Sequence, residues 1–255
     1  AAEYVAREIP MAAAAAAASA HLPPDTLVGY IGSEWEGAQI YTEARLDLIL
    51  AAASLGSTSD EVLANFEGRR IDYFIWNRPS TALEDWRSTV LSMSFLREHS
   101  RILEGDNGGY LFEIRPGKGT GWDRNEANLL QDPELDSIRD DGPWTTIGRV
   151  RGGRGVISMQ LKSSIVQRVS IEGGTPYLLV ASGQCPKLAV GTQLVLRWFN
   201  NHEVELGADV EQVFPGIDQS DQFLWHRAPE SATSVSVELI ESRCEFSKIG
   251  LYAAS

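Results

Sequence analysis

The sequence predicts two domains, a small α/β domain followed by an all-β sandwich. Apolar residues recur at every second position from 194 to 198 and from 235 to 239, the pattern of strands with one buried face. Helical spacing is confined to the first part of the chain, and residues 115–121 between the two parts are rich in glycine and proline. We therefore expect domains at residues 1–115 and 122–255, with a hinge near Pro116.

The first domain alternates helices and strands. We expect helices at residues 1–20, 46–55, 59–66 and 83–99, and strands at residues 26–32, 70–76 and 110–114. The first helix is interrupted near Pro10 and ends before Pro23 and Pro24, because two prolines cannot continue a helix. Ser59, Asp60 and Glu61 place a cap and carboxylates in the first turn of the third helix. This order of elements is typical of a small α/β unit.

The second domain shows short strands separated by turn residues. We expect strands at residues 128–130, 144–150, 155–161, 165–171, 176–182, 192–199, 203–213, 222–226, 233–240 and 246–252. So many short strands, joined in part by long polar connections, favour an antiparallel jelly roll over a parallel sheet.

The composition limits the classes of partner. The formal net charge of -13 repels phosphate backbones, so we expect no nucleic-acid partner. No apolar run reaches the ~20 residues that span a bilayer, and we expect no signal peptide, since the alanines at 12–18 favour a plain helix. Cys185 and Cys244 are either a disulfide pair or two unpaired buried residues.

No catalytic motif emerges from the sequence. The four histidines are scattered, and the glycines at 152–155 lead into a strand rather than a helix N-terminus. Paired carboxylates such as Asp140 and Asp141 lie in acidic loops, whereas glycoside hydrolysis needs two carboxylates at a fixed separation across a cleft. We expect no catalytic residue in this chain, and the sequence leaves open whether the protein is an enzyme.

Sugar binding requires less, because an aromatic face and a few polar side chains are sufficient. Trp144 and Trp198 are expected in the core, while Arg197 and Phe199 point opposite to Trp198. We take a small group as candidates for carbohydrate binding: Trp225, Arg197, Phe199, Asn200 and His202.

The second half resembles the jelly-roll carbohydrate-binding modules. The resemblance rests on residues 128–136, which begin Asn-Leu-Leu, on Gly142-Pro143-Trp144, and on the order of the segments 174–180, 196–200, 228–233 and 246–252. In that family a calcium ion often ties the first strand to the last. The acidic ligand corresponds to Asp136, but the closing aspartate position holds Ser247, so the resemblance implies only a weakened calcium site.

The first half resembles the soluble extracytoplasmic tail of membrane glycosyltransferases that use lipid-linked sugars. The matching segments are residues 22–28, 71–73, 95–99 and 108–114. The resemblance implies a membrane-tethered region outside the cytoplasm, in the periplasm or at the cell surface. Membrane spans and catalytic residues would then lie elsewhere in the parent chain.

Together these observations predict a non-catalytic region that binds or positions cell-envelope glycan. The expected partners are a glycan or a lipid-linked sugar acceptor, and the membrane-embedded part of the same chain. Two alternatives stay open. One is a protein-interaction module without sugar affinity, and the other is a secreted glycan-active enzyme.

Overall fold

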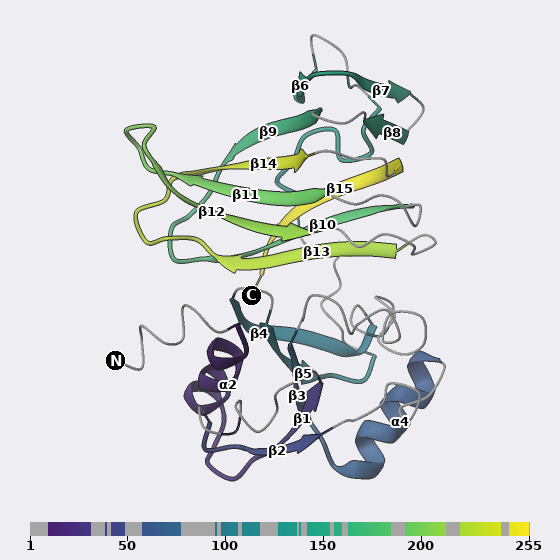
Figure 1. Cartoon of the computed structure of the whole chain (residues 1–255), viewed down its shortest axis with the longest axis vertical. Coiled ribbons are helices and arrows are strands. Elements are labelled where there is room, and N and C mark those ends of the chain that lie inside the picture. Colours follow the sequence, from purple (N-terminus) through teal and green to yellow (C-terminus); the bar gives the residue numbers. More distant parts are fainter. Residues whose placement is uncertain are drawn as a thin grey trace. The chain divides into compact units, whose positions relative to one another are not determined.

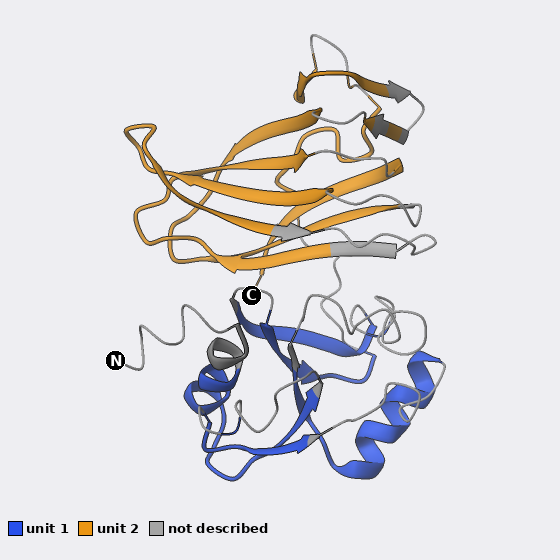
Figure 2. Ribbon diagram, in the orientation of Figure 1, with its two compact units in different colours: residues 1–124 blue, residues 125–255 orange. Residues whose placement is uncertain are grey.

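The computed structural model describes a large part of the chain. The described residues are 10–31, 39, 42–48, 58–77, 95, 98–106, 109–117, 127–136, 138, 142–153, 156–159, 163–184, 192–212, 220–240 and 245–254. Most of these residues lie in strands, and the chain divides into two compact units, residues 1–124 and 125–255 (Figures 1 and 2).

The first unit is built on a mixed five-stranded sheet with the order β2-β1-β3-β5-β4. Strand β1 pairs in parallel with β2 and β3, whereas β5 pairs antiparallel with β3 and β4. The strands are β1 (Leu27–Ile31), β2 (Arg45–Leu48), β3 (Tyr73–Asn77), β4 (Ser100–Asp106) and β5 (Gly109–Ile114).

A helix packs on each face of this sheet (Figure 1). Helix α2 (Pro10–His21) buries Ala15 and Ala18 in one cluster with Tyr30 and Ile75. Helix α4 (Ser59–Arg69) presents Phe66 to the opposite face, where its ring stacks on Phe74 at 5.3 Å. Side chains alternate along β3, so its neighbouring residues Phe74 and Ile75 pack against α4 and α2 on opposite faces of the sheet.

Two predictions for this unit are corrected or fall outside the described residues, and one strand was not predicted. Residues 46–48, expected to begin the helix at 46–55, belong to β2, because they pair with β1 and pairing overrides local helical spacing. Strand β4 was not predicted, and it directly follows helical residues 98 and 99. The expected helix at 83–99 lies mostly outside the described residues.

The second unit consists of two five-stranded sheets, and every described pairing in them is antiparallel. The β11 sheet has the order β12-β11-β14-β9-β6, and the β10 sheet has the order β13-β10-β15-β8-β7. The strands are β6 (Thr145–Ile147), β7 (Val150–Gly153), β8 (Val156–Met159), β9 (Ser164–Ser170), β10 (Pro176–Gln184), β11 (Gln193–Phe199), β12 (Glu205–Gln212), β13 (Ser220–Arg227), β14 (Ser234–Ile240) and β15 (Glu245–Ala253).

The two sheets share one hydrophobic core. It contains Leu194 and Trp198 from β11, Val237 from β14 and Leu179 from β10, all almost completely buried. The alternating apolar residues from which β11 and β14 were predicted therefore point into the core, as expected. Their neighbours in the chain point away from the core and form the outer face of the β11 sheet.

Residues 128–130 do not form the predicted strand. Asn128 instead ties this segment to β15, because its Oδ1 accepts from the N–H groups of Leu130 and Leu251, each at 3.0 Å. Single backbone hydrogen bonds, such as Leu129 N to Leu251 O at 2.9 Å, replace a ladder.

The predicted domain bounds stay a prediction, since residues 118–126 are not described. Among the described helices, neither is both long and apolar enough to cross a membrane.

Candidate functional site

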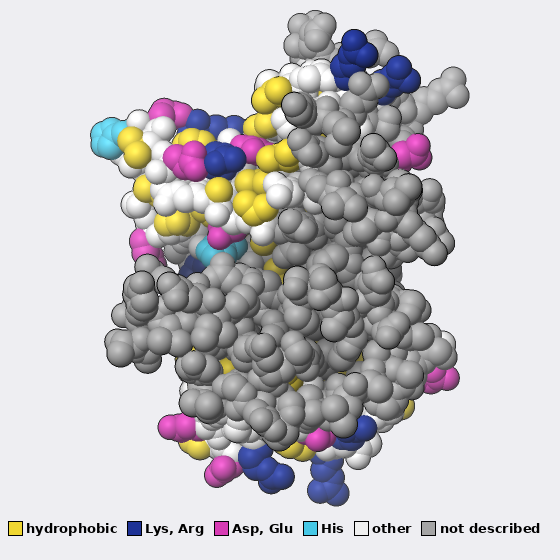
Figure 3. Space-filling view, viewed as in Figure 1, with side chains coloured by type: hydrophobic (Ala, Val, Ile, Leu, Met, Phe, Trp, Pro, Cys, Tyr) yellow, Lys and Arg dark blue, Asp and Glu magenta, His cyan; other side chains and the backbone are white. Residues whose placement is uncertain are grey.

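Two arginines share a row on the outer face of the β11 sheet. Arg197 of β11 is opposite Ser236 of β14, which is in turn opposite Arg168 of β9. Phe199 and Ser234 are paired in the next row. We call this surface the arginine face and define it by Arg168, Arg197, Phe199, Ser234, Ser236 and Glu238. Figure 3 shows charged side chains of both signs next to hydrophobic ones on the second unit.

Arg197 is held by two carboxylates. Its Nε and Nη2 donate to Glu238 at 2.9 and 3.3 Å, and its Nη1 donates to Glu205 at 3.0 Å. The bond with Glu238 raises the pKa of Arg197, burial lowers it, and the bond with Glu205 raises it again, so the net shift is upward. Arg197 is therefore charged at any physiological pH.

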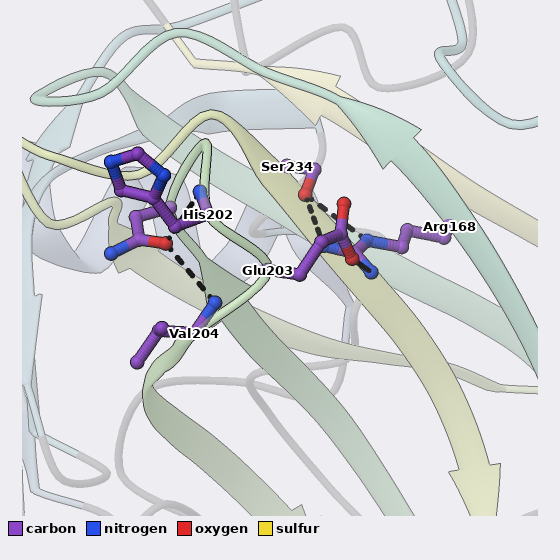
Figure 4. Close-up of polar contacts among 6 residues, drawn as sticks. Arg168, His202, Glu203, Val204 and Ser234 are labelled. Atoms are coloured by element: carbon purple, nitrogen blue, oxygen red, sulfur yellow. Dashed lines mark hydrogen bonds and ion pairs between the residues drawn. The ribbon is translucent and has the colours of Figure 1, made fainter.

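Arg168 makes a second, separate cluster (Figure 4). Its Nε and Nη2 donate to the hydroxyl of Ser234 at 3.1 and 2.8 Å, and its Nη1 forms an ion pair with Glu203. The guanidinium carbon lies 4.1 Å from the centroid of the Phe199 ring, within the range of a cation–π contact. Side chains from β9, β11, β14 and the 200–204 turn thus meet at one point.

Asn200 organises the turn that carries Glu203. Its Oδ1 accepts from the N–H groups of His202 at 2.9 Å and Val204 at 3.0 Å, which is the local bonding typical of asparagine in turns. Glu203 has a φ of 64°, in the left-handed region. Figure 4 shows the His202 ring pointing away from the Arg168 cluster. Asn200 therefore has a structural role, and exposed His202 lies beside the cluster rather than in it.

Trp225 is not part of this surface. It lies on β13, in the other sheet, and only 2 % of it is exposed. Its pairing with Leu178 puts it on the side of the β10 sheet that faces away from the shared core. Its Nε1 has no hydrogen-bond partner in the structure. Trp225 thus lies apart from the arginine face, and its part in sugar binding stays a prediction.

The residues that the resemblance assigns to calcium do not form a cluster of charged ligands. Asp136 is exposed in a turn, where its N–H donates to Asp132 at 3.0 Å, and the Ser247 hydroxyl donates to the Ser182 carbonyl at 3.4 Å. Within the described ranges, no three His, Cys, Asp or Glu side chains come together. Calcium prefers several charged oxygens, so these residues fit it poorly.

The arginine face unites two predicted residues with several that sequence reasoning missed. Arg197 and Phe199 were predicted, whereas Arg168, Ser234, Glu203 and Glu238 were not. The alternation along β9 and β14 puts Arg168 and Ser234 on polar faces, but only strand register shows that those faces coincide. Cys185 and Cys244 lie outside the described residues.

Comparison with known proteins gives similarity to solved structures only. No protein-family model matches the sequence, and no curated protein sequence matches it. The tailspike protein 4 enzymatically active domain of bacteriophage CBA120 is 12 % identical, with a TM-score of 0.41 over 54 % of this chain and 24 % of that one. The xylanase 10B of Clostridium thermocellum, crystallised as a binding module with its catalytic module and xylohexaose, is 13 % identical, with a TM-score of 0.37 over 51 % and 29 %.

The similar structures also include isolated carbohydrate-binding modules. The family 61 module TmCBM61, in complex with β-1,4-galactotriose, is 13 % identical, with a TM-score of 0.34 over 50 % of this chain and 99 % of that one. This chain thus spans about a quarter of the tailspike and xylanase structures but nearly all of the isolated module. Each of these TM-scores is below 0.5.

Proposed function

We propose that this chain is a non-catalytic glycan-binding region, in which a small α/β domain precedes a jelly-roll sandwich. The observation that carries the proposal is the arginine face, where Arg168, Arg197 and Phe199 gather on one side of a sheet. Guanidinium and hydroxyl groups donate to sugar hydroxyls, and a half-buried ring with a planar group stacked on it offers a flat contact surface. A shallow sheet face suits an extended glycan.

The proposal extends to the setting of the protein. The segments that resemble extracytoplasmic glycosyltransferase tails support a parent chain that is embedded in a membrane and uses lipid-linked sugars. There the region would position cell-envelope glycan or a sugar acceptor beside a membrane active site, outside the cytoplasm. Several hydrophobic spans in the genomic sequence upstream of residue 1 are the expected observation, and their absence contradicts this parentage without affecting sugar binding.

A glycan array with the whole chain tests sugar binding, followed by titration calorimetry with the oligosaccharide that binds best. Phe199→Ala should weaken binding about tenfold, because the Arg168 guanidinium stacked on the ring loses its support, and such a contact contributes on the order of 1 kcal/mol or more. Ile147→Ala is the matched control, since Ile147 is an exposed hydrophobic residue of β6, at the far edge of the same sheet. A chain that binds no glycan on the array contradicts the proposal.

A further inference from the structure

The two arginines of the arginine face differ in how firmly their carboxylate partners are held. Arg197 forms a two-point contact with Glu238, whose side chain is only 14 % exposed. Arg168 pairs with Glu203, whose side chain is 73 % exposed and stands on a turn. A bidentate pair that is partly buried is stronger than an exposed pair, which contributes at most about 1 kcal/mol. Glu203 is therefore the carboxylate that an incoming group can displace.

The rest of the Arg168 cluster fixes the guanidinium without Glu203. Ser234 accepts from Nε and Nη2, and the Phe199 ring supports the planar group from below at 4.1 Å. Because three strands hold these contacts, removing Glu203 leaves the guanidinium oriented, with Nη1 available to an acceptor. A planar guanidinium matches a carboxylate better than it matches a neutral hydroxyl.

We propose that Arg168, with Phe199 and Ser234, is a subsite for the carboxylate of an acidic sugar such as a uronic acid, and that Glu203 occupies it when no ligand is bound. This inference rests on the proposed function, because it names the class of glycan that the arginine face prefers. Glu203 shows the chemistry directly, since its own carboxylate takes the place of the ligand group at Nη1.

The overall charge of the chain opposes this binding but does not prevent it. The net charge of -13 repels an acidic glycan at long range, yet the Debye length is about 8 Å at physiological salt. Contact with Arg168 acts over a shorter distance. We therefore expect the preference for an acidic sugar to be clearest at physiological ionic strength rather than at low salt.

Trigalacturonic acid and its fully methyl-esterified form are the probes, because they share a sugar skeleton and differ in the carboxylate charge. Calorimetry with the whole chain measures both dissociation constants. Glu203→Ala should tighten binding of the acid about fivefold, the equivalent of the roughly 1 kcal/mol an exposed pair contributes, and leave binding of the ester unchanged. Arg168→Gln should abolish the gain when combined with Glu203→Ala.

Glu245→Ala is the control for net charge, since Glu245 is exposed on β15 in the other sheet. An equal gain in that variant, or an equal gain for acid and ester in Glu203→Ala, overturns the inference. The expected effect of Glu203→Ala is tighter binding of the acid, which a misfolded protein cannot produce. If the ester binds but Glu203→Ala does not bind the acid more tightly, the carboxylate subsite is wrong and the proposed function is unaffected. If no glycan on the array binds, the proposed function is wrong as well.

Discussion

Arg197 and Glu238 are joined across neighbouring strands by two hydrogen bonds, from Nε at 2.9 Å and from Nη2 at 3.3 Å. They are not directly opposite one another, because Glu238 is paired with Val195 in the β11–β14 ladder. The guanidinium therefore reaches diagonally to the carboxylate. This diagonal contact leaves the position directly opposite Arg197 to Ser236, which is almost completely buried.

Arg197→Gln should lower the free energy of unfolding by about 2 kcal/mol, because it leaves two carboxylates close together and removes hydrogen bonds to a charged group. Glu205→Gln should lower it by less than about 1 kcal/mol, since Glu205 is the more exposed partner. Urea unfolding followed by tryptophan fluorescence measures both changes. Equal losses in the two variants would show that the two-point contact with Glu238 adds nothing.

The long central strands of the second unit, such as β11 and β14, were predictable because their apolar residues alternate and face the core. On β14, Val235, Val237 and Leu239 point into the core, and this alternation is a property of a single strand. The partner of a polar residue is not such a property. Arg168 meets Glu203 and Ser234 only after three strands take their register, so no local pattern could identify that cluster.

Two other differences between the predicted and the observed structure also arise because strand pairing is not a property of the local sequence. Residues 46–48 followed helical spacing in the sequence, yet pairing with β1 makes them part of a strand, because a sheet edge satisfies their backbone groups. Trp225 lay between polar residues, which left its direction open. Its pairing with Leu178 puts it on the side of the β10 sheet away from the shared core, and this direction follows from strand register rather than from the local sequence.

The N-terminus of α4 carries a capping box. The Thr58 side chain accepts from the Glu61 N–H at 3.2 Å, and the Glu61 carboxylate accepts from the Thr58 N–H at 3.2 Å. Thr58→Ala should destabilise the first unit by about 1 kcal/mol, because one N–H of the first turn loses its acceptor. Glu61→Gln is the control, since glutamine also completes the box. Thermal unfolding by circular dichroism should separate the two variants by several degrees, and matching melting temperatures would argue against the cap.

Asp209 links the edge strands of the two sheets of the second unit. Its Oδ2 accepts from the indole N–H of Trp198 at 2.5 Å, and its Oδ1 lies 3.3 Å from Nδ1 of His226 on β13. Trp198 is almost completely buried, so Asp209→Ala removes the acceptor of an N–H that lies in the core. Leaving such a donor unsatisfied costs about 1–3 kcal/mol. Asp209→Ala should therefore be clearly destabilising, whereas Asp209→Asn keeps an acceptor oxygen and should cost less.

A double-mutant cycle isolates this bond from the contact between Asp209 and His226. Trp198→Phe removes the donor, so Asp209→Ala should cost about 1–2 kcal/mol less in that background than in the unmodified chain. Urea unfolding of the four proteins gives the coupling free energy between residues 198 and 209. A coupling near zero would mean that the indole finds another acceptor.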